Sequence, residues 1–288
     1  MKQITIVSGK GGTGKTTLAA SLIEIFDNHV AADCDVDAPN LFLLTNSKVK
    51  ECHEYVGGKK AEIHSNCIAC GKCIDVCRFD AINEGQPFTV DSFACEGCNA
   101  CVQVCPVEAI TMEDSKSGDY YLSETEKYPF THALLKPGEE KSGGLVAEVR
   151  KLANEITRKE NKDYIIIDGS PGIGCSTTSS ITGTSYVIVV TEPTTSGIHD
   201  LQRIIQTVEH FRRDFSVVIN KYDINLEKTE EIRNFCMENG YDLLGKIPYD
   251  DYVRKAALEA RSVVHFEDSK ATKSIKEIYR KLLEKLGG

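Results

Sequence analysis

Two groups of residues in this chain of 288 have the types and spacing to carry out chemistry. The first is the segment Gly9-Lys10-Gly11-Gly12-Thr13-Gly14-Lys15-Thr16, which fits the pattern G-x-x-x-x-G-K-[ST]. Glycines let backbone N–H groups curl around phosphate oxygens without a Cβ clash, and the N-terminus of the next helix adds its positive dipole end. The pattern therefore predicts a nucleoside triphosphate site, with Lys15 on the β- and γ-phosphates and Thr16 on Mg²⁺.

The second group is a run of eight cysteines between residues 67 and 105, out of twelve in the chain. Two sets with the spacing C-x2-C-x2-C-x3-C recur at an offset of 28 residues. This is the spacing of bacterial ferredoxins, in which the fourth cysteine of each run binds the cluster of the other run. The spacing predicts two [4Fe–4S] clusters, the first held by Cys67, Cys70, Cys73 and Cys105 and the second by Cys95, Cys98, Cys101 and Cys77.

Zinc is the disfavoured alternative for these cysteines, because zinc sites usually separate two cysteine pairs by about a dozen residues or more. A purely structural role for the clusters stays open. Arg78 stands where a proline usually follows the fourth cysteine, whereas Pro106 follows Cys105. This departure puts the local turn in question, but not the ligand set.

Outside the cysteine block, apolar strand patterns alternate with amphipathic helix patterns. Strand-like runs lie at residues 4–7, 30–32, 164–167, 186–190, 215–219 and 243–247, and helix-like runs at 15–26, 145–156, 198–211, 227–239, 250–261 and 270–286. The alternation predicts an α/β fold with a doubly wound, mostly parallel sheet. We expect residues 1–59 and 114–288 to form this domain, with a small ferredoxin-type α+β domain inserted at 60–113, and we interpret the polar stretch 113–118 as a connection.

Composition narrows the function classes further. The net charge of −9 argues against a general DNA- or RNA-binding protein. The longest apolar runs are far shorter than the ~18–20 residues that span a bilayer, and no secretory signal pattern opens the chain. Clustered cysteines in such a chain indicate metal or redox chemistry rather than disulfides. We therefore expect a cytoplasmic protein that binds neither nucleic acid nor membrane.

The string K-G-G-T-G-K-T-T resembles the deviant Walker A phosphate loop of the MinD/ParA/nitrogenase-iron-protein class of P-loop ATPases. Further segments that resemble this class are 35–41, 168–175, 191–194 and 246–250. Taken with both cysteine runs, the chain resembles MinD-superfamily ATPases that carry an inserted ferredoxin domain, whose relatives include orange-protein-complex-type proteins. The resemblance implies an ATP-dependent homodimer in which Lys10 reaches the partner's phosphates and stabilises transition-state charge.

The resemblance also implies roles for individual residues. Asp35 is expected to activate the attacking water beside the catalytic Lys10 and Lys15, with Asp37 as a reserve, and Asp168 is expected to hold Mg²⁺ together with Thr16. Gly169 to Gly172 would form a switch that follows the γ-phosphate. The expected nucleotide contacts are Gly11, Gly12, Thr13, Gly14, Lys15, Thr16, Thr17, Asn220, Pro248 and Asp250.

Base recognition and two other features stay open in the sequence. Asn220-Lys221-Tyr222-Asp223 fits the guanine-reading pattern N-K-x-D, but ATPases of the MinD class also carry an asparagine there, so ATP is favoured and GTP remains an alternative. Buried free thiols are the default for the four remaining cysteines, although Cys175 follows the switch and is a candidate cluster ligand at a dimer interface. The apolar face at residues 275–286 fits packing on the sheet better than membrane binding.

We expect an ATPase whose nucleotide-driven dimer switch is coupled to electron transfer by the two clusters, serving a redox partner or a metallocofactor-maturation protein. One alternative is an iron–sulfur assembly or carrier ATPase, with the clusters as cargo. A second is a MinD-like spatial regulator with redox-sensing clusters.

Overall fold

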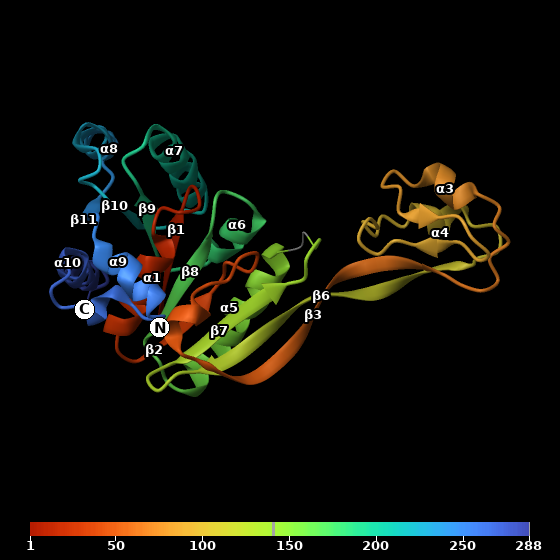
Figure 1. Ribbon diagram of the computed structural model, residues 1–288, viewed down its shortest axis with the longest axis horizontal. Helices are drawn as coiled ribbons and strands as arrows, with labels where there is room; N and C mark the ends of the chain where they lie inside the picture. Colours follow the sequence, from red (N-terminus) through yellow and green to blue (C-terminus); the bar gives the residue numbers. More distant parts are fainter. Residues whose placement is uncertain (140–141, 288) are drawn as a thin grey trace. The chain divides into compact units, whose positions relative to one another are not determined.

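The computed structural model describes residues 1–139 and 142–287 of the chain (Figure 1). The chain divides into a larger unit, Met1–His53, Tyr120–Leu134 and Ser142–Gly288, and a smaller unit, Glu54–Asp119 and Leu135–Lys141.

The described strands of the larger sheet follow the order β11-β10-β9-β1-β8-β2-β7-β6-β3. Neighbouring strands from β11 to β7 pair in parallel. Their bounds are β1 Lys2–Ser8, β2 His29–Asp33, β7 Pro129–Leu135, β8 Tyr164–Pro171, β9 Tyr186–Thr191, β10 Phe215–Asn220 and β11 Leu243–Ile247. The predicted α/β fold with a mostly parallel sheet is confirmed.

Helices cover both faces of this sheet, because successive strand residues point to opposite faces. Ile4 and Ile6 of β1 pack in one apolar cluster with α1, α9 and α10, whereas Val7 packs in another with α7 and α8. The described helices of the larger unit are α1 Lys15–Ile25, α2 Phe42–Thr45, α5 Ser142–Lys159, α6 Cys175–Ile181, α7 Thr195–His210, α8 Leu226–Glu238, α9 Asp251–Leu258, the 3-10 turn η1 Val263–His265 and α10 Lys270–Lys285. The helix-like runs of the sequence correspond to α1, α5, α7, α8, α9 and α10.

Two long strands were not expected from the sequence. These strands, β3 (Lys48–Ile63) and β6 (Ile110–Glu124), each continue from one unit into the other. The expected domain boundaries at 59/60 and 113/114 therefore fall inside regular strands, and the stretch 113–118 is strand rather than linker. β3 is largely exposed and β6 is mostly half-buried, and neither contains a continuous run of buried apolar residues like those of the other strands.

The smaller unit contains two short helices, α3 (Lys72–Val76) and α4 (Ala100–Val104), and a two-stranded antiparallel pair, β4 (Ile82–Asn83) and β5 (Thr89–Val90). Its apolar cluster is built around Ala61, Cys73, Phe88 and Ile110. The 28-residue repeat of the sequence is visible in these elements, since α4 begins and ends 28 residues after α3.

No helix in the described part of the chain is long and apolar enough to cross a membrane. The apolar face of α10 faces the core instead, where Ile275, Ile278 and Leu282 are buried.

Candidate functional site

The parallel strands bring the predicted site residues to one edge of the sheet. Ile6 of β1 lies opposite Asp168 of β8, Asp168 lies opposite Asp33 of β2, and Ser8 lies opposite Val190 of β9. Since the carboxyl ends of parallel strands meet at one edge, the loops that follow these strands are neighbours. This is the edge at which open α/β sheets bind ligands.

The phosphate loop runs from the end of β1 to the start of α1 and requires its glycines. Gly12 and Gly14 have φ of 79° and 88°, a left-handed conformation that favours glycine. A Cβ on Gly14 would also lie 2.1 Å from Nδ2 of Asn220. The loop borders a cavity of about 560 Å³, lined by Ser8, Gly11, Gly12, Thr13, Gly14, Lys15, Thr16, Thr17, Asp35, Asp37, Ala38, Asn40, Ser170 and Pro171.

Carboxylates of the chain itself neutralise Lys15 in this cavity. Its Nζ lies 2.6 Å from Oδ1 of Asp168 and 3.8 Å from Oδ2 of Asp35. Burial lowers the pKa of Lys15, but the charge and hydrogen bond of Asp168 outweigh it, so the net pKa is raised. The ammonium group is therefore charged, which is the form that binds phosphate.

The aspartates differ in what their oxygens contact. Asp33 accepts hydrogen bonds from the backbone N–H groups of Asp35 and Leu41, at 3.0 and 3.1 Å, so it shapes the turn that presents Asp35. Burial raises the pKa of both Asp33 and Asp35, and the charge of Asp168 adds to the effect at each. Asp35 is buried while Asp37 is exposed, and both border the cavity.

A buried carboxylate oxygen marks the place where a cation fits. Oδ2 of Asp168 is buried without a hydrogen-bond partner among the described residues, whereas Oδ1 accepts from Lys15. Thr16 borders the same cavity. Carboxylate and hydroxyl oxygens suit Mg²⁺, so the donor set fits the predicted ion.

A second cavity of about 200 Å³ lies on the other side of Gly14 and Thr17. Leu18, Asn220, Lys221, Ile247, Pro248, Tyr249, Asp250, Val253, Arg254 and Ala257 complete its lining. The cavity therefore contains the three base-side residues expected from the sequence. Asn220 donates from Nδ2 to the carbonyl of Thr13 at 2.7 Å. This hydrogen bond connects a residue that lines the second cavity to the phosphate loop that lines the first.

Two aspartates near this second cavity already have structural partners. Asp250 caps α9 through the N–H of Tyr252 and accepts from Ser269 and the N–H of Ala271 at the start of α10. Asp223, the acid of the guanine-reading pattern, accepts from the N–H of Tyr249 at 2.7 Å. Both oxygens of Asp250 thus have protein partners, whereas the contact of Asp223 uses only its Oδ1. The choice between adenine and guanine stays a prediction.

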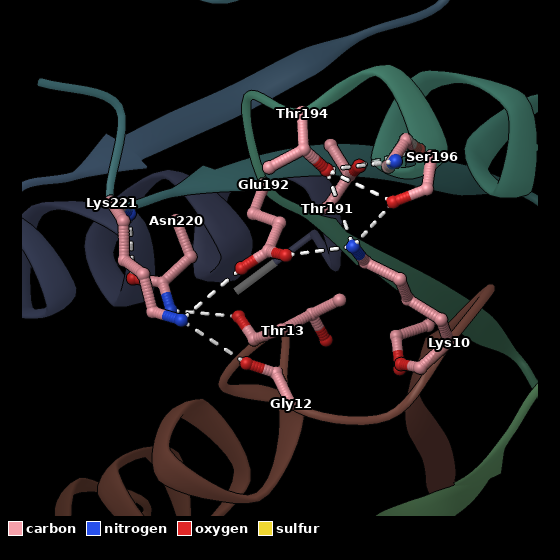
Figure 2. A network of polar contacts seen from close by, with 11 residues as sticks. Lys10, Gly12, Thr13, Thr191, Glu192, Thr194, Ser196, Asn220 and Lys221 are labelled. Carbon is pink, nitrogen blue, oxygen red and sulfur yellow. Dashed lines mark hydrogen bonds and ion pairs between the residues drawn. The ribbon is translucent and has the colours of Figure 1, made fainter. Parts of the chain in front are cut away.

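Lys10 lies on the opposite side of the phosphate loop, against the loop between β9 and α7 (Figure 2). Its Nζ lies 2.8 Å from Oε1 of Glu192 and donates to Ser196 and Thr194 at 2.8 and 3.2 Å. Lys221 contacts the other oxygen of Glu192 at 3.1 Å. In the sequence, segment 191–194 was noted only because it resembles the family. Glu192 is 182 residues from Lys10, and no sequence pattern predicted that the two side chains would pair.

Sequence analysis also missed a hydrogen bond between the candidate switch at Gly169 to Gly172 and the turn that presents Asp35. Ser170 donates its hydroxyl to the carbonyl of Cys34 at 2.5 Å, next to Asp35. The segment that starts at Gly169 is thereby connected to the turn that presents Asp35.

In the smaller unit, Cys77, Cys95, Cys98 and Cys101 line one pocket together with apolar residues that include Phe79, Ile82, Val90 and Met112. These four cysteines are the set predicted for the second cluster. Of the first set, Cys67, Cys73 and Cys105 join the apolar cluster of the unit, and Cys70 is exposed. Burial raises the pKa of Cys73 and Cys101.

The two cysteine runs share one backbone conformation. Three residues of each run have positive φ at the 28-residue offset: Ala69, Gly71 and Asp80 in the first, and Gly97, Asn99 and Glu108 in the second. Cys77 and Cys105 end their helices with φ and ψ of −75° and 113°, and −73° and 112°. Cys77, which precedes Arg78, therefore has the same backbone conformation as Cys105, which precedes Pro106.

Among the described residues, no three His, Cys, Asp or Glu side chains converge as they would on a single metal ion. In a cubane each thiolate binds a different iron, so its sulfurs surround a volume rather than a point. The iron–sulfur assignment stays a prediction, supported by the donor set and by amide N–H groups that donate to Cys67 and Cys105 at 3.4 and 3.2 Å.

The cysteines outside the two runs differ in exposure. Cys34 and Cys236 are buried, as expected of free thiols, but Cys52 is exposed and that expectation was wrong. Cys175 is exposed at the start of α6, and its role as a cluster ligand stays a prediction.

The fold and the phosphate loop define a P-loop nucleotide-binding protein. Residues 4–263 match the family described as the CobQ/CobB/MinD/ParA nucleotide binding domain. The chain belongs to this family.

Relatives along the whole chain support the assignment. An uncharacterized protein of Methanocaldococcus jannaschii is 37% identical over 285 residues, which cover 98% of this chain and 96% of that protein. The septum site-determining protein MinD of Bacillus subtilis is 28% identical over 141 residues, 47% of this chain and 52% of that one. Among solved structures, the septum site-determining protein MinD of Pyrococcus horikoshii, complexed with Mg-ADP, has a TM-score of 0.60 at 21% identity and covers 100% of this chain and 97% of that chain.

Proposed function

We propose that this protein is an ATP-hydrolysing iron–sulfur protein in which a nucleotide-driven homodimer switch is coupled to electron transfer through two [4Fe–4S] clusters. The observation that carries the proposal is the pocket lined by Cys77, Cys95, Cys98 and Cys101, in a chain that also has a complete phosphate loop. The partner served would be a redox protein or a metallocofactor-maturation protein.

The larger unit would bind ATP by exchanging carboxylates for phosphates. Lys15, which pairs with Asp168 in the structure, would bind the β- and γ-phosphates in its place. Asp168, released from Lys15, would hold Mg²⁺ together with Thr16. The second cavity, with Asn220 and Pro248 in its wall, would hold adenine.

Asp35 would orient and activate the attacking water. It lies at the wall of the same cavity as Lys15 and Thr16 and contacts Lys15 through one oxygen. Its raised pKa suits a general base better than an exposed carboxylate would, because a base with a higher pKa takes up a proton more readily. Lys10 would complete the site by reaching the phosphates bound to a second copy of the chain.

The smaller unit would hold the two clusters, which supply one-electron redox chemistry when bound. Cys67, Cys70, Cys73 and Cys105 would bind the first, and Cys95, Cys98, Cys101 and Cys77 the second. Apolar side chains line the second site, and the amide N–H groups that donate to Cys67 and Cys105 would stabilise added negative charge at the first.

A titration of the reduction potentials, followed by electron paramagnetic resonance, tests the proposal. The protein is prepared without oxygen and titrated with and without MgATP. Coupling predicts that MgATP shifts at least one potential in the unaltered chain but not in Lys15→Ala, which retains all cluster ligands. Absence of any iron–sulfur signal would overturn the cluster assignment. Reduction potentials that are the same with and without MgATP would overturn the coupling.

Cluster delivery is a second candidate, favoured by the exposure of Cys70 and Cys98 at the surface of the smaller unit. Transfer of a cluster to an apo-ferredoxin, measured by visible circular dichroism, would support delivery. Clusters retained over many ATP turnovers would favour electron transfer.

A further inference from the structure

Lys10 and Lys15, the two lysines of the phosphate loop, are each paired with carboxylates of their own chain. Lys15 is held by Asp168, a residue of the same cavity. Lys10 is held outside the cavity by Glu192, at 2.8 Å, and by the hydroxyl groups of Thr194 and Ser196. Figure 2 shows its ammonium group pointing toward the loop between β9 and α7, with Glu192 between Lys10 and Lys221.

Glu192 has two cationic partners, one on each oxygen. Oε1 faces Lys10, and Oε2 faces Lys221. Lys221 also donates to the carbonyl of Gly12 at 3.2 Å, so its position is fixed by the phosphate loop. Burial raises the pKa of Glu192, but the two lysines outweigh it and lower the net pKa, so the carboxylate stays charged.

The second partner makes the contact with Lys10 reversible. When Lys10 leaves, Glu192 still has Lys221, so no carboxylate is stranded in a half-buried position. Removing the sole partner of a buried charge is costly, whereas opening one of two partly exposed ion pairs costs little. The side chain of Lys10 is 27% exposed and that of Glu192 is 16% exposed, so this is a partly exposed ion pair that costs little to open.

The backbone around this contact is capped and closely packed. Thr194 caps α7 by accepting from the N–H of Gly197 at 3.0 Å. Gly9, the residue before Lys10, packs so closely on α7 that a Cβ there would lie 2.3 Å from the carbonyl of Asp200. Release of Lys10 therefore requires only a change in its own side chain.

We infer that Glu192 is a positioning residue that holds Lys10 within its own protomer until nucleotide and a second copy of the chain draw it away. This inference rests on the proposed role of Lys10 across a homodimer. The contact with Glu192 competes with the contact to the partner's phosphates. Glu192 therefore sets the protein concentration at which the nucleotide-bound dimer forms and restrains an isolated protomer.

The hold on Lys10 is tested first in the protein without nucleotide. An amine-specific acetylating reagent is applied, and the rate at Lys10 is followed by peptide mass spectrometry. Glu192→Gln keeps the shape of the side chain but removes its charge, so the rate at Lys10 is expected to rise about fivefold. Glu192→Asp keeps the charge and should restore part of the protection.

Glu231→Gln is the matched control, because Glu231 pairs with Lys228 on α8 and does not touch the phosphate loop. Its rate at Lys10 should equal that of the unaltered chain. Equal rates at Lys10 in Glu192→Gln and the unaltered chain would overturn the inference, and so would a rise accompanied by loss of the folded state in circular dichroism.

The effect on the dimer is tested by sedimentation velocity with Mg²⁺ and a non-hydrolysable ATP analogue. Glu192→Gln should form the dimer at about fivefold lower protein concentration than the unaltered chain. An unchanged or higher concentration would overturn the role in assembly. If the unaltered chain forms no dimer while Lys10 labelling still depends on Glu192, the proposed homodimer fails and the hold on Lys10 stands.

Discussion

At the scale of single residues, the site is held together by exchangeable pairs. Lys15 pairs with Asp168, and one oxygen of Asp168 has no partner among the described side chains. When a phosphate replaces Asp168 as the partner of Lys15, the carboxylate of Asp168 in β8 loses its cationic partner. A divalent cation bound there would compensate its charge. Binding of phosphate and metal should therefore be cooperative at this site.

Lys15 and Asp35 should fail in different ways when altered. Lys15→Ala removes the main cationic contact to phosphate, so ATP affinity should fall by about a hundredfold, equivalent to about 3 kcal/mol. Asp35→Ala should retain ATP binding and lower the hydrolysis rate by about 10²–10⁴-fold, the usual contribution of a general base. Calorimetry measures binding, and phosphate release measures hydrolysis.

Asp37→Ala is the control for Asp35, because Asp37 borders the same cavity but is exposed. Its hydrolysis rate should stay within a few-fold of the unaltered chain. A large loss in Asp37→Ala with full activity in Asp35→Ala would reverse the assignment of the two carboxylates.

At the scale of elements, Asp250, which the sequence predicts to contact the nucleotide, joins two helices and also lines the base-side cavity. Asp250 caps α9 and accepts from Ser269 and the N–H of Ala271 at the start of α10. Burial raises its pKa, but these hydrogen bonds outweigh it and lower the net value. The side chain lines the base-side cavity while its oxygens act on the helix termini.

Asp250→Ala should therefore act on stability more than on the choice of nucleotide. We expect a loss of about 1–2 kcal/mol in the free energy of unfolding, because one helix cap and two hydrogen bonds from the start of α10 disappear. The ratio of ATP to GTP affinity should stay within about twofold. Urea unfolding and competition binding measure the two quantities, and a tenfold change in the ratio with unchanged stability would show a base contact after all.

The paired cysteine runs give a sharper test at the same scale. Cys77 belongs to the first run in the sequence but borders the pocket of Cys95, Cys98 and Cys101. Cys77→Ser should thus disturb the cluster of the second run and leave the other intact, so that iron content falls by about half or less. Mössbauer or resonance spectra of Cys77→Ser and Cys98→Ser should match each other and differ from those of Cys70→Ser.

Cys236→Ser serves as the control, since Cys236 is a buried residue of α8 in the larger unit. Its cluster content should be unchanged. Spectra in which Cys77→Ser resembles Cys70→Ser would show that each run binds its own cluster.

The elements also show what the sequence can predict. Buried parallel strands such as β8 and amphipathic helices such as α7 are local patterns, and they were located within a few residues. The strands β3 and β6 were missed because neither contains a continuous run of buried apolar residues. The partner of Lys10 was missed because Glu192 is distant in the chain and only the fold brings the two together.

At the scale of the whole molecule, acid stability depends on histidines enclosed by the larger unit. His29 at the start of β2 is buried beside Tyr128, with ring centroids 4.7 Å apart. Burial, assisted by the charge of Lys162, lowers the pKa of His29 to about 4. Burial likewise lowers the pKa of His132 on β7 to about 4. Both rings are neutral in the folded protein over most of the range in which they would charge in the unfolded chain.

The sign of the pH dependence follows from these lowered values. The stability that a neutral His29 contributes is complete above its unfolded pKa of about 6.5 and is lost as the pH falls toward 4. At pH 5 the loss from this one residue should be on the order of 2 kcal/mol relative to pH 7.5. His29→Phe keeps an aromatic ring but cannot titrate, so its unfolding free energy should depend less steeply on pH by that amount.

Urea unfolding at pH 7.5 and pH 5, followed by far-ultraviolet circular dichroism, measures this difference; the chain contains no tryptophan for fluorescence. His199→Phe is the control, because the side chain of His199 is 69% exposed. Its pH dependence should equal that of the unaltered chain. If His29→Phe also keeps the full slope, acid lability arises elsewhere, and the enclosure of His29 beneath Tyr128 does not limit the stability of the larger unit.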